Sequence, residues 1–225
     1  MAGRKLVMGD IHGNLKAFLQ CMERSAFDIG LDTLIQLGDV SDRHPYTVEV
    51  VEELLKIPSL IALRGNHDSW TWEWLENGSA DIAWLENGGF ATVESYKKSN
   101  DAIDLDRHRE FFRETQINFY IDSDKKLFVH AGYTDLNGPD NEIDPAICYW
   151  DRSLWRNALA EKGKLIKPQI LANFKEIYIG HTPTLNWEKS TPMKVFNIWN
   201  LDTGAGTNGK LTIMDIETKE YWQSD

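Results

Sequence analysis

Five short motifs combine acidic, amide and imidazole side chains, and each follows an apolar run. In chain order they are GDIHG at 9–13, GDVSDR at 38–43, GNHD at 65–68, HAG at 130–132 and GHT at 180–182. Carboxylate and amide oxygens mixed with imidazole nitrogens suit divalent ions such as manganese, iron or zinc. Two such ions about 4 Å apart activate water and bind phosphoryl oxygens. The motifs therefore predict a dinuclear hydrolytic site.

Strands must bring these motifs together, because the motifs lie far apart in the sequence. The first half alternates strand and helix patterns, with a strand at 5–9, a helix at 14–25, a strand-helix unit at 33–57 and a strand at 59–64. This order predicts a parallel sheet with right-handed crossovers, in which ligands bind beyond the carboxyl ends of the strands. An extended strand end would also place Asp10 and His12 on one side of the chain.

The second half contains mostly strand patterns. We expect antiparallel strands at 117–122, 126–130, 175–180, 193–199 and 210–216, with a helix from Cys148 to Leu159 between them. Strands that follow an alternating half predict a second sheet packed on the first, with helices outside. No linker-like composition interrupts the 225 residues, so we expect one domain over 1–225.

A tryptophan-rich segment separates the two halves. The sequence WLENG occurs at 74–78 and again at 84–88, which predicts two short helices that each end at Asn-Gly. Together with 101–115 they would form a helical cap insertion over roughly 69–116, beside the motif cleft. Four tryptophans either line a recognition surface there or simply pack the cap, namely Trp70, Trp72, Trp74 and Trp84.

Composition narrows the class of protein. The formal net charge of −11 argues against nucleic acid as a partner, because nucleic-acid affinity comes from a basic face. Cys21 and Cys148 are too few for a disulfide framework, and we expect both to be buried. No apolar run is long enough for a membrane span or a signal peptide, so we expect no membrane association and a cytoplasmic location. The oligomeric state is left open.

The ordered set of motifs resembles that of the calcineurin-like metallophosphoesterases, and within them the phosphoprotein phosphatase group. It is most similar to the short bacterial and phage lambda-type serine/threonine phosphatases and to the diadenosine tetraphosphate hydrolases. The resemblance extends from Lys5 to about Gly206. It implies an α/β fold in which two packed β-sheets are flanked by helices, the αββα sandwich.

The resemblance also implies two bound divalent ions. By this resemblance, the ligands of the first ion would be Asp10 and His12, and those of the second would be Asn66, His130 and His181. Asp39 would bridge the two ions. Manganese is the first expectation for both ions, and iron and zinc are alternatives. A hydroxide that bridges the ions would attack phosphorus directly, so no covalent phosphoenzyme would form.

Two arginines are expected to bind the phosphoryl group, which Asn66 would also contact. Arg43 follows from the GDVSDR motif, and its planar guanidinium can donate two parallel hydrogen bonds to phosphate oxygens. A second arginine is expected from the segment YWDRSLWR, where we choose Arg152 over Arg156.

The remaining motif residues suggest proton transfer. His67 is expected to act as a general acid toward the leaving group, with Asp42 as the anionic partner that keeps it protonated. Outside the motifs, His44 and His108 are expected to be ordinary surface or helix residues. Asp202 either orients a metal ligand or begins a turn.

Three functions follow as alternatives. The first is hydrolysis of phosphomonoesters, with phosphoserine and phosphothreonine in proteins as main substrates and small phosphoesters as further partners. The second is hydrolysis of dinucleotide polyphosphates such as diadenosine tetraphosphate, with the same metals and a different cap. The third is a metal-bound scaffold without activity, against which the complete set of ligand and catalytic residues argues.

Overall fold

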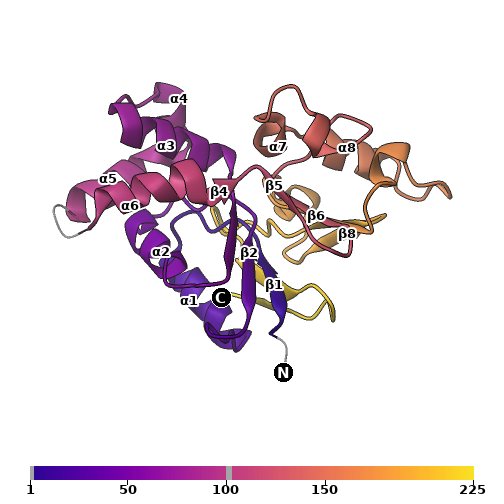
Figure 1. The fold of residues 1–225 in the computed structure, drawn as a ribbon, viewed down its shortest axis with the longest axis horizontal. Coiled ribbons are helices and arrows are strands. Elements are labelled where there is room, and N and C mark those ends of the chain that lie inside the picture. The colour runs from indigo at the N-terminus through magenta and orange to yellow at the C-terminus, as the bar shows by residue number, and fades with distance from the viewer. Residues whose placement is uncertain (1–2, 100–102) are drawn as a thin grey trace.

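Two β-sheets lie at the centre of the computed structural model, which describes residues 3–99 and 103–225 (Figure 1). The first sheet has the strand order β11-β10-β1-β2-β3-β4 and the second the order β5-β6-β7-β9-β8. The strands of the first sheet are β1 (Lys5–Met8), β2 (Thr33–Gln36), β3 (Leu60–Leu63), β4 (Gln116–Ile117), β10 (Thr212–Asp215) and β11 (Tyr221–Gln223). Those of the second are β5 (Phe119–Ile121), β6 (Lys126–Val129), β7 (Glu176–Ile179), β8 (Met193–Val195) and β9 (Ile198–Asn200).

The first sheet confirms the predicted alternation of strands and helices. β1, β2 and β3 pair in parallel, and α1 (Leu15–Arg24) and α2 (Thr47–Leu54) connect them. Asn14 caps α1 as expected, because its Oδ1 accepts a hydrogen bond from Ala17 N at 3.1 Å. The carboxyl ends of the three strands therefore meet at one edge of the sheet, where the first three motifs begin.

The second sheet is mixed, so the prediction of mostly antiparallel strands is wrong. β6–β7 and β7–β9 pair in parallel, while β5–β6 and β8–β9 are antiparallel. Long connections between β6, β7 and β9 carry helical segments, and such crossovers permit parallel pairs. The predicted strand 210–216 is β10, which joins the first sheet beside β1. The predicted strand 117–122 is not one strand, because Ile117 ends β4 of the first sheet and Phe119–Ile121 form β5 of the second.

The predicted helix from Cys148 to Leu159 is broken in two. α7 (Ile147–Trp150) ends at Asp151, and α8 (Ser153–Ala160) begins after Arg152. The Asp151 carboxylate accepts hydrogen bonds from Ser153 N and Leu154 N, both at 2.9 Å, which restarts the helix. Three short 3₁₀ helices complete this half, η4 (Pro139–Asn141), η5 (Gln169–Leu171) and η6 (Thr184–Trp187).

Helices of the cap cover one side of the molecule, and α7 and α8 lie on the other (Figure 1). The cap contains α3 (Asn66–Asn77), α4 (Ile82–Trp84), η1 (Leu85–Gly89), α5 (Phe90–Ser99), α6 (Leu105–Glu110) and η3 (Phe111–Thr115). Gly78, with φ of 72°, ends α3 as predicted. Gly88 does not end a helix, because the chain kinks there and continues into α5. Its carbonyl instead accepts a hydrogen bond from Arg43 N at 3.0 Å.

His108 is a helix residue, as expected, but it lies in the interior and not on the surface. It is fully buried in α6. Its Nε2 donates to Glu52 of α2 at 2.9 Å, and its Nδ1 accepts from the Tyr96 hydroxyl of α5 at 2.8 Å. His108 therefore ties three helices together.

A shared core joins the two sheets. Val7, Ile35 and Leu63 of the first sheet pack with Phe128 and Tyr178 of the second. The α/β fold with two packed sheets and flanking helices is thus confirmed. Both cysteines are buried and free. Over residues 3–99 and 103–225, no helix has the length and apolarity to cross a bilayer. The assignment of 1–225 to one domain stays a prediction.

Candidate metal centre

Asp39 lies between two groups of potential metal ligands. Its Oδ2 is 3.6 Å from His12 Nε2, and its Oδ1 is 3.4 Å from His130 Nε2. Ligand atoms of His12, Asp39 and His67 lie within 4.8 Å of one another, and so do those of Asp39, His130 and His181. Asp39 belongs to both groups, which is the position that a bridging carboxylate needs.

The tautomers of the histidines favour a cation at this position. His12 Nδ1 donates to the Ser41 carbonyl at 2.9 Å, and His130 Nδ1 donates to the Leu37 carbonyl at 2.7 Å. A carbonyl can only accept, so a neutral imidazole directs the lone pair of Nε2 toward the Asp39 carboxylate. Burial lowers the pKa of His12 to about 3, which keeps it neutral. Two lone pairs that face each other fit a metal ion between them.

His181 adds a second observation in favour of metal binding. Its Nε2 is buried and has no hydrogen-bond partner among the described residues. Burial first, and His130 next, hold the pKa of His181 well below its usual range, so the imidazole is neutral. A buried ring nitrogen without a partner costs free energy, and in the tautomer that carries the proton on Nδ1 its lone pair can bind a cation. The residues present therefore fit a divalent ion.

Asp10 is buried beside this group, but its carboxylate is already bonded to the backbone. It accepts from His181 N at 3.0 Å, and neither of the two ligand groups includes it. Burial and the nearby carboxylates of Asp202 and Asp39 raise the pKa of Asp10 well above its usual range. A bound cation would remove that repulsion. Its role as a ligand stays a prediction.

Strand alternation does not bring Asp10 and His12 together. β1 ends at Met8, and His12 has a left-handed backbone with φ of 52°. Ile11 N and His12 N both donate to the Asp39 carbonyl, at 3.0 and 2.9 Å. The turn after the strand, held by these two bonds, therefore directs His12 toward Asp39.

Asn66 and His67 are the first two residues of helix α3. Asn66 Oδ1 lies 3.4 Å from His130 Nε2, beside the group formed by Asp39, His130 and His181. Gly65 precedes them, and a Cβ atom there would lie 2.0 Å from Asp39 Oδ1. Only glycine permits this approach of the two motifs.

Asp68, the last residue of GNHD, was not assigned a role from the sequence. It is fully buried, and its Oδ1 accepts from Val40 N and Ser41 N at 2.9 and 3.2 Å. Its Oδ2 accepts from Gly65 N at 3.1 Å. Asp68 therefore fixes the loop that carries Asp39 against the loop that carries Asn66. The one sign in the sequence that Asp68 has a role was its position in the GNHD motif.

His67 and Asp42 form a buried pair beside the ligands. His67 Nδ1 donates to Asp42 Oδ2 at 2.6 Å. Trp84 Nε1 also donates to Oδ2, at 2.8 Å, and the Thr92 hydroxyl donates to Oδ1 at 2.7 Å. Among ion pairs of the described residues, Asp42 has His67 alone as a cationic partner. Burial lowers the pKa of His67, but Asp39 and Asp42 raise it by more.

Two of the four cap tryptophans serve packing. Trp84 is 1% exposed, and Trp74 packs against Trp84 and Tyr96. Trp84 also bonds to Asp42, a contact that its WLENG repeat did not indicate. Trp70 differs, because its ring lies edge-on to His67 at 5.3 Å.

A small cavity opens over the ligands. Its volume is about 120 Å³, and Arg43 and Arg152 both line it, whereas Arg156 is not among the lining residues. Asp202 lines it as well, and its Oδ1 accepts from Gly204 N at 3.0 Å, which is the turn, one of the two alternatives for this residue. Burial raises the pKa of Asp202 to about 7. His44 stays outside and bonds through Nε2 to the Ala205 carbonyl.

Comparison with known proteins places this arrangement in a family. The model of the family described as calcineurin-like phosphoesterase matches residues 3–202. Serine/threonine-protein phosphatase 1 of Salmonella typhimurium is 26% identical over 94% of this chain and 91% of its own length. The symmetrical bis(5'-nucleosyl)-tetraphosphatase of Proteus mirabilis is 27% identical over 96% of this chain and 95% of its own.

A solved structure supports the fold independently. A protein serine/threonine phosphatase from Saccharomyces cerevisiae superimposes with a TM-score of 0.63 over 99% of this chain and 80% of that one. The two sequences are 13% identical, so the likeness concerns the fold alone.

Proposed function

The chain belongs to the calcineurin-like phosphoesterase family, and from this premise we propose that it hydrolyses phosphomonoesters, with phosphoserine and phosphothreonine in proteins as its main substrates. The observation that carries the proposal is the buried bond of 2.6 Å between His67 and Asp42. A buried carboxylate with three donors around it is stable as an anion when one donor is a cation. His67 is therefore held as an imidazolium, ready to donate a proton.

A proton donor matters most for a poor leaving group. The alkoxide of serine or threonine leaves slowly unless it is protonated, and a positioned general acid contributes about 10²–10⁴-fold. The nucleoside diphosphate that leaves from a dinucleotide polyphosphate is already a stable anion and needs no such help. The pair of His67 and Asp42 therefore favours phosphoserine and phosphothreonine over the polyphosphate alternative.

In this proposal, one set of residues binds the metal ions, and two arginines bind the phosphoryl group of the substrate. The ions would be held by Asp10, His12, Asn66, His130 and His181, with Asp39 as the bridge, and we propose manganese first, with iron or zinc as alternatives. When bound, two such ions supply the Lewis acidity that activates a water for attack on phosphorus.

Arg43 and Arg152 line the cavity over these ligands. Each guanidinium can donate to two phosphoryl oxygens, and Asn66 can add an amide donor. A volume of about 120 Å³ suits a single phosphoryl group, and two arginines suit its charge. A chain of four phosphates would need more cationic side chains than these.

The test is a panel of substrates with manganese added to the wild-type protein. It compares kcat/KM for a phosphoserine peptide, p-nitrophenyl phosphate and diadenosine tetraphosphate. We expect the peptide to exceed the dinucleotide by about a hundredfold, equivalent to two well-made polar contacts. A preference of that size for the dinucleotide would replace the proposal by the polyphosphate alternative, which the Proteus mirabilis relative represents.

A further inference from the structure

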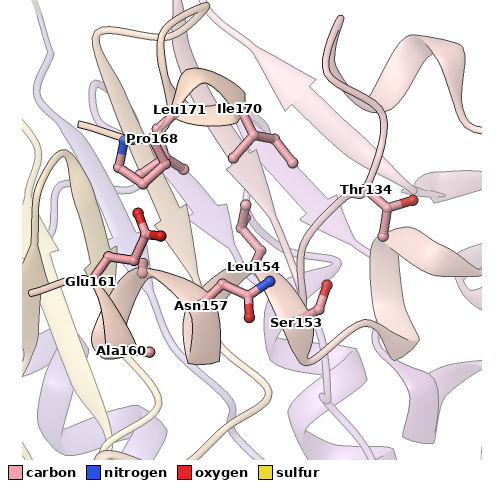
Figure 2. A pocket seen from close by; sticks show the side chains of 10 residues that line it. Thr134, Ser153, Leu154, Asn157, Ala160, Glu161, Pro168, Ile170 and Leu171 are labelled. Atoms are coloured by element: carbon pink, nitrogen blue, oxygen red, sulfur yellow. The ribbon is translucent and has the colours of Figure 1, made fainter. Parts of the chain in front are cut away.

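A groove of about 480 Å³ runs along α8 (Figure 2). Ser153 lines the groove, and the residue before it, Arg152, lines the small cavity. The two spaces share no lining residue, but the N-terminus of α8 borders both of them. The small cavity holds about 120 Å³, so any large substrate must extend beyond it.

The two walls of the groove differ in their polar content. Pro168, Ile170 and Leu171 form one wall (Figure 2). The opposite wall, formed by α8 and the residue after it, is mixed, because the polar Ser153, Asn157 and Glu161 line it together with the apolar Leu154, Ala158 and Ala160. The three polar residues are four positions apart, so they share one helix face at intervals of about 6 Å. Ser153 and Asn157 are exposed, so their polar atoms are accessible to a ligand.

This spacing matches an extended polypeptide. Alternate residues of a strand repeat at about 6.6 Å, so the backbone amides of a bound peptide can meet the three polar residues at every second residue. The side chains between them then face the wall formed by Pro168, Ile170 and Leu171. From Ser153 to Glu161 the groove extends about 12 Å along the helix, which accommodates about four extended residues.

The charge of the lining favours a basic ligand over an anionic one. Glu161 is the one charged residue among those that line the groove, so a polyphosphate would meet a carboxylate there. A lysine or arginine at the far end of a peptide would instead be attracted. Glu161 is already paired with Lys164 at 3.1 Å, but an exposed pair of this kind contributes little and is easily exchanged.

From these observations we propose that the groove along α8 binds the polypeptide that flanks the phosphorylated residue. The peptide is extended, covers about four residues, and is favoured by a basic residue at the Glu161 end. The inference rests on the proposed phosphoprotein phosphatase activity. It adds a specificity site formed by Ser153, Asn157 and Glu161 outside the catalytic cavity.

The experiment measures kcat/KM for phosphoserine peptides that lengthen one residue at a time, in one series toward the N-terminus and in another toward the C-terminus. In one of the two series we expect a gain of about tenfold, the worth of one or two net hydrogen bonds, which saturates after the groove is filled. A terminal lysine in that series should add a further gain, which Glu161→Gln should remove.

Two tryptophan substitutions locate the effect. Ala160 lines the groove and is exposed, so Ala160→Trp fills the groove without disturbing the core. Gln169 is exposed between two lining residues but is not one of them, so Gln169→Trp is the matched control. Ala160→Trp should abolish the gain with peptide length, while Gln169→Trp should keep it. Hydrolysis of p-nitrophenyl phosphate should be equal in both, which excludes misfolding.

The outcomes separate the two proposals. If short phosphoserine peptides are hydrolysed but neither series gains with length, or if Ala160→Trp keeps the gain, the groove proposal is wrong and the phosphatase proposal stands. If p-nitrophenyl phosphate is hydrolysed but no phosphopeptide is, the phosphoprotein phosphatase proposal is wrong. The groove proposal, which rests on it, is then wrong as well. Slower cleavage of diadenosine tetraphosphate in Ala160→Trp alone would assign the groove to the dinucleotide.

Discussion

Five residues of the candidate site have backbone conformations that non-glycine residues rarely adopt. Positive φ values occur at His12 (52°), Asp39 (54°), Asp42 (75°), Arg43 (66°) and His181 (66°). Each such conformation costs about 1–3 kcal/mol, and strain of this kind is concentrated at binding and catalytic sites. In this chain the left-handed turns after the strands direct the side chains back over the strand ends. These backbone conformations could not be predicted from the motifs, because none of the five residues is glycine.

The proton donor can be tested with isosteric variants. His67→Asn and Asp42→Asn should each lower kcat for a phosphoserine peptide by about 10²–10⁴-fold, because the alkoxide then leaves unprotonated. Hydrolysis of p-nitrophenyl phosphate should fall much less, since nitrophenolate leaves readily without a proton. The metal content of both variants should equal that of the wild type. Equal losses for both substrates, or a missing ion in the His67 variant, would show that His67 is a metal or phosphate ligand.

The two phosphate arginines can be tested against a matched neighbour. Arg43→Ala and Arg152→Ala should each lower kcat/KM by an amount equivalent to about 2–4 kcal/mol, because each removes a charge-assisted bidentate contact. Arg156→Ala should leave kcat/KM near the wild-type value, since Arg156 is not among the residues that line the cavity. Loss of an ion from Arg43→Ala would make Arg43 structural to the metal site, and a larger effect at Arg156 would reverse the choice between the two.

Among the helices, those of the cap hold one carboxylate of the candidate site in place. Asp42 follows β2, but two of its donors come from the cap, Trp84 at the end of α4 and Thr92 in α5. They lie 42 and 50 residues along the chain from Asp42. The cap therefore fixes the carboxylate that holds His67, and a displaced cap would loosen the proposed proton donor.

Thr92→Val tests this coupling between the cap and the site. The substitution keeps the shape of the side chain but leaves Asp42 Oδ1 without its donor, at a cost of about 1–3 kcal/mol. We expect a lower unfolding temperature and a fall of kcat for phosphoserine by about tenfold, smaller than that of Asp42→Asn. Thr92→Ser keeps the hydroxyl and should retain kcat. If Thr92→Val unfolds earlier but keeps full kcat, the cap serves stability alone.

Elements were predictable from the sequence to different degrees. The strands and helices of the first sheet follow directly from apolar periodicity, and their parallel order follows from the alternation. The second sheet was mispaired, because a strand pattern identifies a strand but not its neighbour. β10 shows this plainly, since it has the pattern of the last strands of the second half and yet pairs with β1. The break at Asp151 was missed because α7 and α8 together continue one helical pattern.

The candidate site was also predictable only in part. Residues inside motifs were identified from the sequence, because each motif joins chemically active residues within a few positions of a strand end. Contacts between distant segments, such as Trp84 with Asp42, leave no local pattern. Asp68 lies between these cases, because its motif was recognised but its bonds to Val40 and Ser41 required the fold.

For the molecule as a whole, His108 makes stability depend on pH. Burial lowers its pKa in the folded protein by more than Glu52 raises it. A folded-state pKa below the unfolded value of about 6.5 means that the unfolded state binds the proton more readily. Stability is therefore lost as pH falls below about 6.5, with a limiting slope of about 1.4 kcal/mol per pH unit.

The variant His108→Gln isolates this contribution, because an amide can replace both hydrogen bonds but does not titrate near neutrality. The free energy of unfolding in urea, measured from pH 8 to pH 5, should fall more steeply for the wild type than for His108→Gln. A wild type that gains stability relative to the variant on acidification would mean that the bond to Glu52 outweighs burial.

A metal titration of the Asp39→Asn protein tests whether five distant segments assemble a two-ion centre around Asp39. Manganese is titrated into metal-free wild-type and Asp39→Asn proteins while bound metal and hydrolysis of p-nitrophenyl phosphate are followed together. We predict two ions per chain and full activity for the wild type. Asp39→Asn should lose at least roughly a hundredfold in activity at saturating manganese, because both ions lose their shared anion. An Asp39→Asn protein that keeps most of its activity at saturating manganese would contradict the dinuclear assignment.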